Sequence, residues 1–279
     1  MMAKTWAITD EQYGKLCGRD DEFRLRVRKG VIPFDAALDH LQAAFDGNMS
    51  KSQYKRKKRA TLIDACGILG ADRVHTPEEV CPLWRQSFPV NVLICYSNEI
   101  LLQAKEANCE GAADRHLFYV PEGMSLIRQR EIRGLNSSKP PYFSSGNDWW
   151  LANEEKACQE KGMAYWPKIS SPAGFYLLDL KPRFPAINGW QAQEDEVAKL
   201  GGKYERAPED VFLFAIQSIY MLTGKNVTSD WWHWGKTVDS DGHCVNVHLY
   251  GGGEAHVNGN RPDRSDGALR VSVSRKFEI

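Results

Sequence analysis

The chain has 279 residues, of which 42% are hydrophobic and 26% are charged. These are the values of an ordinary globular protein, and they exclude a disordered, collagen-like or coiled-coil chain. The 36 basic and 36 acidic residues give a formal net charge of zero, so no overall field attracts nucleic acid or an anionic membrane. The length predicts one large domain, or one domain with a smaller appendage.

Targeting signals and cysteine usage indicate the compartment. No apolar run approaches the roughly 18 residues of a membrane span, and residues 1–12 lack the apolar core of a signal peptide. We therefore expect a cytoplasmic protein without membrane insertion, with virion association or non-classical export as alternatives. The seven cysteines are odd in number and form no CxxC pair, which argues against a disulfide framework or zinc ribbon. We expect small buried thiols.

Residues 1–85 are expected to form an N-terminal helical module. Apolar side chains recur at helical spacing over residues 34–45. Residues 51–59 hold six basic residues in nine, which fits either a contact to a phosphate backbone or a solvated helix start. We favour the solvated helix because the charge of the whole chain is balanced. The next helix is expected over residues 59–69, with one side formed by Leu62, Ile63, Cys66 and Leu69.

Residues 86–279 are expected to form one mixed domain of helices and strands. The helix at 208–222 has the strongest signals, because Pro208 suits its first turn, Glu209 and Asp210 complement its dipole, and Gly224 follows its end. Its expected inner face is formed by Val211, Phe214, Ala215, Ser218, Ile219 and Leu222. Further helices are expected at 100–107 and 152–161, strands at 91–96, 116–120 and 175–180, and a long loop at 134–148.

The last fifty residues have the pattern of an antiparallel β unit. Apolar residues alternate at 245–249 and at 269–273. The dipeptides Asp241-Gly242, Asn258-Gly259 and Asp266-Gly267 are typical of hairpin turns. The residues expected to point inward are Val247, Leu249, Val271, Val273 and Phe277.

The composition of this region departs from that of the rest of the chain. Lys, Glu, Gln, Met and Trp make up 61 of the 279 residues, so residues 237–271 should contain about eight of them if composition were uniform. They contain one, Glu254. All other residues of this segment can be reached by changing the first two bases of an asparagine codon. Turn-rich β segments are also generally poor in Lys, Glu, Gln and Met, which is the alternative explanation.

This segment resembles the variable region of proteins encoded with diversity-generating retroelements. It is rich in Gly, Asn, Asp, Ser, His and Tyr, follows the tryptophans at 231, 232 and 234, and is closed by the plain strand sequence VSVSRKF. In that family, reverse transcription miscopies template adenines and the altered copy replaces the C-terminal coding region. The resemblance covers about residues 140–279, with a variable region at about 230–271. It implies an α+β fold with a C-type lectin-like domain, in which 152–162 and 208–222 would be the two helices.

The resemblance implies a surface for a ligand, most simply a protein, and neither a cofactor nor nucleic acid as partner. Polar and aromatic side chains at turns, or on the strand face opposite Val245, Val247 and Leu249, are expected to form it. The expected ligand-binding residues are His243, Asn246, His248, Tyr250, His256, Asn258, Asn260, Arg261, Asp263, Arg264 and Asp266. Trp232 and Trp234 are expected to share one face and to pack beneath the loops.

Other chemistry has weaker support. Four histidines, at 233, 243, 248 and 256, lie near Cys244, but their spacing fits no standard zinc site. Asp239-Ser240-Asp241-Gly242 opens like a calcium loop but lacks the later acidic ligand, so a turn is expected. Gly251–Gly253 has no phosphate-cradle context and is expected to be a flexible display loop. We expect no metal.

Two functions from different classes follow from these patterns. The first is a diversified ligand-binding display protein that is not an enzyme, since the chain contains no nucleophile elbow, HExxH or kinase motif. The second is a nucleic-acid-associated protein or an enzyme that uses residues 51–59 and the histidine-rich tail. The sequence favours the first.

Overall fold

The computed structural model describes residues 59–87, 92–184, 189–228, 230–264 and 266–276. The chain divides into two compact units, Met1–Lys57 and Lys58–Ile279. The expected helix at 34–45, the basic residues 51–58 and the inward-pointing Phe277 lie outside the described residues.

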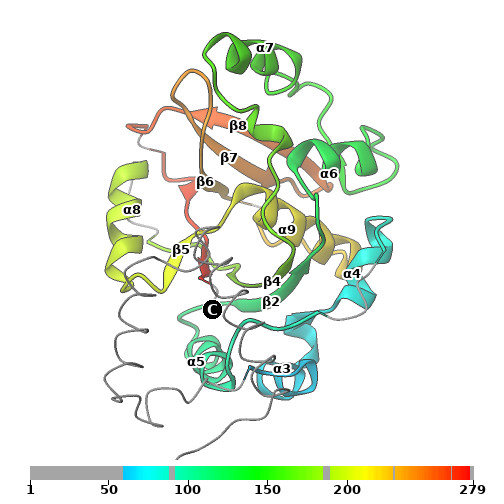
Figure 1. The fold of residues 1–279 in the computed structure, drawn as a ribbon, viewed down its shortest axis with the longest axis vertical. Helices are drawn as coiled ribbons and strands as arrows, with labels where there is room; N and C mark the ends of the chain where they lie inside the picture. Colours follow the sequence, from blue (N-terminus) through cyan, green and yellow to red (C-terminus); the bar gives the residue numbers. More distant parts are fainter. Residues whose placement is uncertain (1–58, 88–91, 185–188, 229, 265, 277–279) are drawn as a thin grey trace, which may run out of the picture. The chain divides into compact units, whose positions relative to one another are not determined.

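The second unit is an α+β fold with two five-stranded sheets (Figure 1). In spatial order, the first sheet contains β1 (Val74–His75), β2 (Arg115–Val120), β4 (Gly174–Asp179), β10 (Val273–Arg275) and β5 (Tyr204–Arg206). The second contains β3 (Tyr142–Phe143), β8 (Glu254–Asn260), β7 (Cys244–Leu249), β6 (Trp232–Val238) and β9 (Leu269–Arg270).

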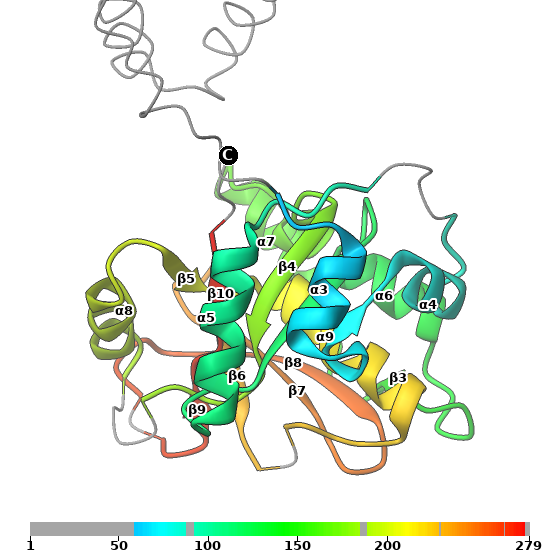
Figure 2. The same ribbon diagram turned by 90° about the horizontal axis from the view of Figure 1, so that it is seen from below.

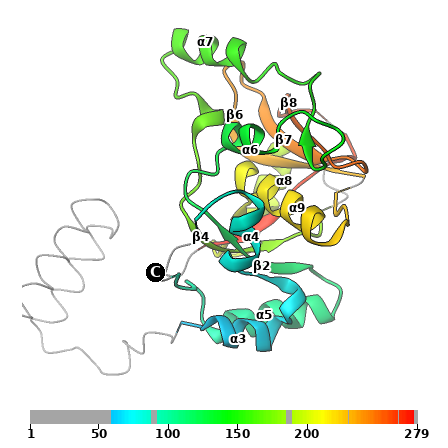
Figure 3. The ribbon, with the colours of Figure 1, turned by 90° about the vertical axis from the view of Figure 1, so that its right-hand side faces the viewer.

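Helices lie between the sheets and outside them. The described helices are α3 (Leu62–Leu69), α4 (Pro77–Leu83), α5 (Asn98–Cys109), α6 (Leu126–Arg133), α7 (Ala152–Glu160), α8 (Trp190–Lys199) and α9 (Glu209–Thr223), with short 3₁₀ turns at Ala71–Arg73 and Trp166–Lys168. Helix α9 contacts β2 of the first sheet and β6 and β7 of the second, and Figure 3 shows it between them. Helices α3 and α5 pack together on the first sheet, on the side viewed in Figure 2.

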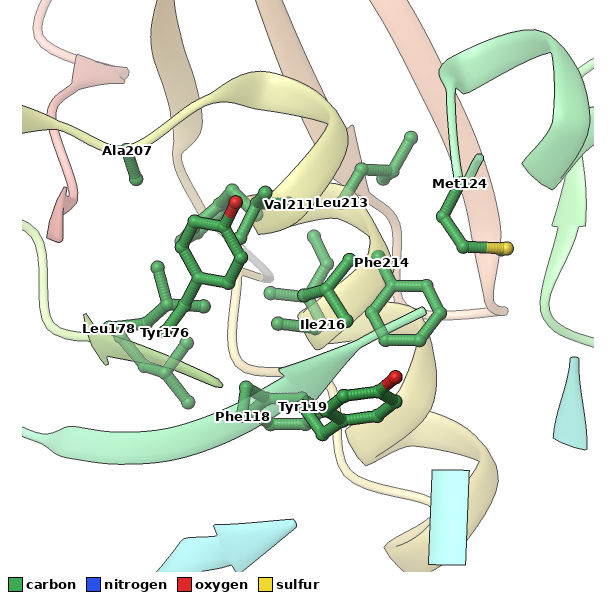
Figure 4. Packing of buried hydrophobic residues seen from close by; sticks show 14 of the residues in the cluster. Phe118, Tyr119, Met124, Tyr176, Leu178, Ala207, Val211, Leu213, Phe214 and Ile216 are labelled. Carbon is green, nitrogen blue, oxygen red and sulfur yellow. The ribbon is translucent and has the colours of Figure 1, made fainter. Parts of the chain in front are cut away.

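Helix α9 forms the centre of the core. Pro208 precedes it, and Gly224 ends it with a left-handed φ of 70°, as the sequence predicts. Every residue from Glu209 to Ile219 is buried, so the helix is covered on all sides rather than along one face. The reason is that sheets lie on both sides of it, and Figure 4 shows Phe214 and Ile216 among side chains from several elements. Leu222, expected on the inner face, is 40% exposed.

Two local expectations were wrong, and one helix was not predicted. Residues 92–96 form no strand; Ile94 and Tyr96 are buried, and the carbonyl of Tyr96 accepts a hydrogen bond from the amide of Ala60. Ile63 is 85% exposed instead of lying on the buried side of α3. The sequence also gave no prediction of α8, in which only Gln193 and Val197 are buried.

The C-terminal region divides between the two sheets. Strands β6, β7 and β8 are antiparallel, as expected. Strand β9, however, pairs with β6 in parallel, and β10 inserts between β4 and β5 of the first sheet. The expected inward residues Val247, Leu249, Val271 and Val273 are all buried, so their burial is confirmed although they do not share one sheet.

The described part of the chain also bears on membrane insertion and on thiol chemistry. None of its helices has both the length and the apolar character that a bilayer span requires. Its six cysteines are free thiols, and Cys81, Cys158 and Cys244 are buried.

Candidate functional site

The face of the second sheet turned away from α9 carries part of the expected site. Val245, Val247 and Leu249 of β7 belong to the core cluster that includes α9, so Asn246 and His248 alternate onto the opposite face. The register places Asn246 between Trp234 and Asn258, and His248 beside His256. We call this surface the outer face; it consists of Trp232, Trp234, Asn246, His248, His256 and Asn258.

Asn246 and His248 belong to the outer face by register, but they are covered rather than displayed. They are only 0% and 1% exposed, which corrects the expectation that β7 displays them. Trp232 stacks on His248 with 4.9 Å between ring centroids, and Trp234, itself fully buried, pairs across the strands with Asn246. Large indoles on the neighbouring strand therefore cover both polar side chains.

An aromatic cluster closes one end of the outer face. It contains Trp232, His248, Tyr250 and His256, with Tyr250 4.2 Å from His248 and 4.7 Å from His256 between ring centroids. Burial lowers the pKa of His248, whose Nδ1 lies 2.6 Å from the carbonyl oxygen of Trp231. Tyr250 is 41% exposed, so it is the member of the cluster most available to a partner.

A hollow of about 390 Å³ lies at the other end of the β7–β8 pair. It is lined by His243, Gly259, Asn260, Arg261, Asp263 and Arg264. All six belong to the compositionally restricted segment, and all except Gly259 are expected site residues. Cys244 and His248 are four residues apart, so the hollow and the aromatic cluster are separated by about 13 Å along the strand.

The side chains of the hollow differ in how firmly they are held. Arg264 donates to Asn260 Oδ1 at 2.6 Å and pairs with Asp266 at 3.0 Å. Arg261 is exposed and forms no hydrogen bond or ion pair from its guanidinium within the described part of the chain. The hollow therefore combines one fixed guanidinium with one that is free to meet a partner.

The turn that carries His243 is organised by a buried carboxylate. Asp239 is 3% exposed, and its Oδ1 accepts hydrogen bonds from the amides of Asp241 (2.9 Å) and His243 (2.8 Å). Its Oδ2 lies 3.4 Å from His243 Nδ1. The segment is thus a turn, as expected. A Cβ on Gly259 would come 2.8 Å from Asp239 Oδ2, so this close approach requires glycine.

Helix α7 holds the same turn from outside. Glu154 is buried, and its carboxylate accepts from the amide (2.8 Å) and the hydroxyl (2.7 Å) of Ser240. Burial works to raise the pKa of Glu154, but the hydrogen bonds from Ser240 outweigh it and the pKa is lowered. Trp166 Nε1 also donates to this carboxylate at 2.7 Å. Glu154 therefore stays ionised and fixes the turn.

The four clustered histidines lie in separate environments. His233 is in the core, His243 lines the hollow, and His248 and His256 belong to the aromatic cluster. Among the described residues, no group of three His, Cys, Asp or Glu side chains could hold a metal ion. Gly251–Gly253, expected to be a display loop, forms the turn of the β7–β8 hairpin, where the amide of Gly253 donates to the carbonyl of Tyr250 at 2.8 Å.

Sequence patterns did not reveal the groups that position this surface. Glu154 lies on a short helix rich in charged residues, where a glutamate is ordinarily solvated. Asn147, whose side-chain amide lies 3.4 Å from His256 Nδ1, belongs to a long loop distant in sequence.

Comparison of the chain with models of protein families, with curated proteins and with solved structures gave no match.

Proposed function

We propose that this chain is a ligand-binding display protein whose segment of about residues 230–271 is diversified by a retroelement. In this proposal the unit Lys58–Ile279 is a C-type lectin-like domain. The observation that carries the proposal is the origin of the hollow's lining: all six residues come from the segment whose composition matches altered asparagine codons.

The burial pattern supports a division between constant and variable positions. The core side of β7 and β8 consists of Val245, Val247, Leu249, Ala255 and Val257, all at most 1% exposed. Valine, leucine and alanine can each be encoded without adenine, so copying errors at adenines would leave such codons unchanged. Diversification of this kind would preserve the packing on α9 while changing the residues of the loops and the half-buried positions of the outer face, His256 and Asn258.

The accessible side chains suit recognition of a protein surface. Hydroxyl, amide, imidazole and guanidinium groups on a rigid frame supply adaptable hydrogen bonds, as in antibody loops. The expected site residues that are exposed or half-buried are His243, Tyr250, His256, Asn258, Arg261, Asp263, Arg264 and Asp266. Asn246, His248 and Asn260 are buried, and we assign them a supporting role beneath the contact surface.

Sequencing the DNA around the gene tests the origin of the segment. We expect a near-copy of the codons for residues 230–279 that differs at adenines, close to a gene for a reverse transcriptase. The codons of Val245, Val247 and Leu249 should lack adenine in that copy. Differences spread over all four bases, or no second copy in the complete genome, would contradict diversification.

A displayed library tests whether the surface tolerates change and binds. One library randomises the eight accessible site residues, and a control library randomises eight core residues of β7, β8 and α9. We expect most members of the first library to fold and some to bind a chosen soluble protein, because surface substitutions usually change stability by less than about 0.5 kcal/mol. If the two libraries lost folded members equally often, the accessible positions would be structural.

A further inference from the structure

A second and larger hollow lies where the start of β2 and the end of β4 in the first sheet come near β6 and β9 of the second. Its volume is about 600 Å³, within the roughly 300–1,000 Å³ range of small-molecule sites. Its lining comes from segments next to β2, β4 and β6 and from β9, and consists of Asp114, Leu180, Lys181, Pro182, Val227, Asp230, Trp231 and Arg270. It shares no residue with the hollow at the β7–β8 pair, so it is a separate site.

The floor of this hollow is apolar. Leu180 and Trp231 are 2% and 4% exposed, so each presents only a small area to the hollow. Pro182 and Val227 are half-buried and supply the more accessible part of the apolar lining. An apolar group of a ligand that enters the hollow would cover this surface and remove it from water.

The rim carries two carboxylates. Asp114 Oδ1 lies 3.4 Å from Arg73 Nη2 and 3.2 Å from His116 Nε2. The hydrogen bond from His116, together with the charge of Arg73, lowers the pKa of Asp114, so this group is ionised and held in place. Asp230 is exposed and forms no side-chain hydrogen bond or ion pair to residues that the structure describes. The rim therefore offers one fixed and one free acceptor for a cation.

The rim also carries a guanidinium with a donor that lacks an acceptor, although its charge helps to lower the pKa of Asp266. Arg270 makes no side-chain hydrogen bond or ion pair to the described residues, and its Nη1 is a buried donor that lacks a partner. Lys181 is less available, because its ammonium group donates to the carbonyl of Gly111. A buried donor without an acceptor is unfavourable, and a carboxylate is the acceptor that a guanidinium binds most strongly. Arg270 is thus suited to an anionic group of a ligand.

From these groups we infer that the hollow binds a zwitterionic small molecule with a large apolar side chain, the chemistry of a free α-amino acid. The carboxylate of the ligand pairs with Arg270, its ammonium group with Asp230 and Asp114, and its side chain packs on Pro182 and Val227. This inference does not depend on diversification of the gene, and a genome without a retroelement would leave it unchanged.

Three matched probes test the inference: L-phenylalanine, phenethylamine, which lacks the carboxylate, and 3-phenylpropanoate, which lacks the ammonium group. Binding is measured by calorimetry on the full chain. We expect phenylalanine to bind at least about tenfold more tightly than either analogue, the ratio that corresponds to loss of one ion-paired hydrogen bond. No heat of binding with phenylalanine at concentrations up to about 10 mM, or equal affinity for all three probes, would overturn the inference.

Two substitutions separate the roles of the charges. Arg270→Gln should weaken the binding of phenylalanine and 3-phenylpropanoate by about tenfold or more and leave the binding of phenethylamine unchanged. Asp230→Asn should weaken the binding of phenylalanine and phenethylamine only. Lys156→Gln on the exposed side of α7 is the matched control and should change the affinity for none of the three probes. Asp230 is exposed, so its variant tests the inference even if Arg270→Gln prevents folding. Equal weakening of all probes by Asp230→Asn would contradict the assigned roles.

Discussion

Strand β7 and the loop that follows β8 are drawn from the same restricted set of residue types, but their surroundings are opposite. All six residues of β7 are buried, whereas Arg261, Pro262, Asp263 and Arg264 in the loop are exposed. Composition therefore does not distinguish the two segments. The fold decides which of them can reach a partner.

The difference has a physical cause in strand order. Strand β7 is the central strand of its sheet, with α9 against one face and the tryptophans of β6 over the other. The described part of the loop is held by a backbone bond from the amide of Trp190 to the carbonyl of Pro262 at 2.9 Å and by an internal bond from the amide of Arg264 to the carbonyl of Arg261 at 3.0 Å. Side chains in the loop are therefore free to change without disturbing core packing, and those of β7 are not.

The largest expected effect tests the cover over β7. Trp234→Ala removes a fully buried indole that packs with Cys244 and Leu269 and should lower the free energy of unfolding by about 3–5 kcal/mol. Urea unfolding followed by circular dichroism measures this loss. Val238→Ala, on the same strand but 44% exposed, is the control and should cost less than about 0.5 kcal/mol. Similar losses for both variants would show that Trp234 is not part of a packed layer.

Acid should destabilise the interior of the same sheet through His233. This residue is 0% exposed, and burial lowers its pKa to about 3 from the ordinary value of 6.5. Its Nε2–H donates to the carbonyl of Ala207 at 2.9 Å, and Nδ1 accepts from the amide of Ser272 at 3.1 Å. A proton on Nδ1 would break the second bond. Stability is therefore complete above pH 6.5 and falls by about 1.4 kcal/mol per pH unit as the pH decreases toward 3.

Unfolding measured between pH 7 and pH 4.5 tests this dependence. His233→Gln should reduce the slope, although His75 contributes its own share because burial, with the charge of His116, lowers its pKa to about 3. Ser272→Ala keeps the backbone amide but loses a hydroxyl bond to Asp179. That control should shift the whole curve without changing its slope. Parallel curves for the natural protein and the His233 variant would rule out the proton linkage.

A moderate effect distinguishes buried from accessible polar residues on the outer face. His248→Ala loses the stack on Trp232 and the bond to the carbonyl of Trp231, and should cost about 1–3 kcal/mol. Asn258→Ala, on the next strand and half-buried, is the matched control and should cost clearly less. If thermal or urea unfolding gave equal losses, burial would not separate the two positions.

Local patterns predicted those elements whose signals are local. Helix α9 was evident because a helix start, an apolar run and a terminal glycine coincide in one segment. The apolar residues at 92–96 have the composition of a strand, yet they form none. Ile94 and Tyr96 are buried while Leu93 is 66% exposed, so an apolar run here reflects burial of alternate side chains without strand pairing. The pairing of Val273 with Arg206 joins distant segments, and no local pattern records which sheet receives β10.

The candidate site was predictable in its residue types and in the turn at residues 239–242, but not in its exposure. Asn258-Gly259, expected to be a hairpin turn, lies within β8. Alternation along β7 correctly separated Asn246 and His248 from Val245, Val247 and Leu249. Whether the polar side was solvated depended on Trp232 and Trp234, whose position opposite these residues is set by cross-strand register. Register is fixed by the whole sheet, so a single strand pattern could not give it.

The smallest expected effect is in the loop itself. A triple variant with Arg261, Asp263 and Arg264 changed to alanine removes one unpartnered guanidinium, one exposed carboxylate and one surface ion pair. Exposed ion pairs contribute about 0–1 kcal/mol because water screens them, so the unfolding free energy should fall by no more than about 1 kcal/mol. The same variant should lose binding to any protein partner selected with the natural surface, measured by biolayer interferometry. A large loss of stability would place these side chains with β7 as structural residues, and unchanged binding would remove the hollow from the contact surface.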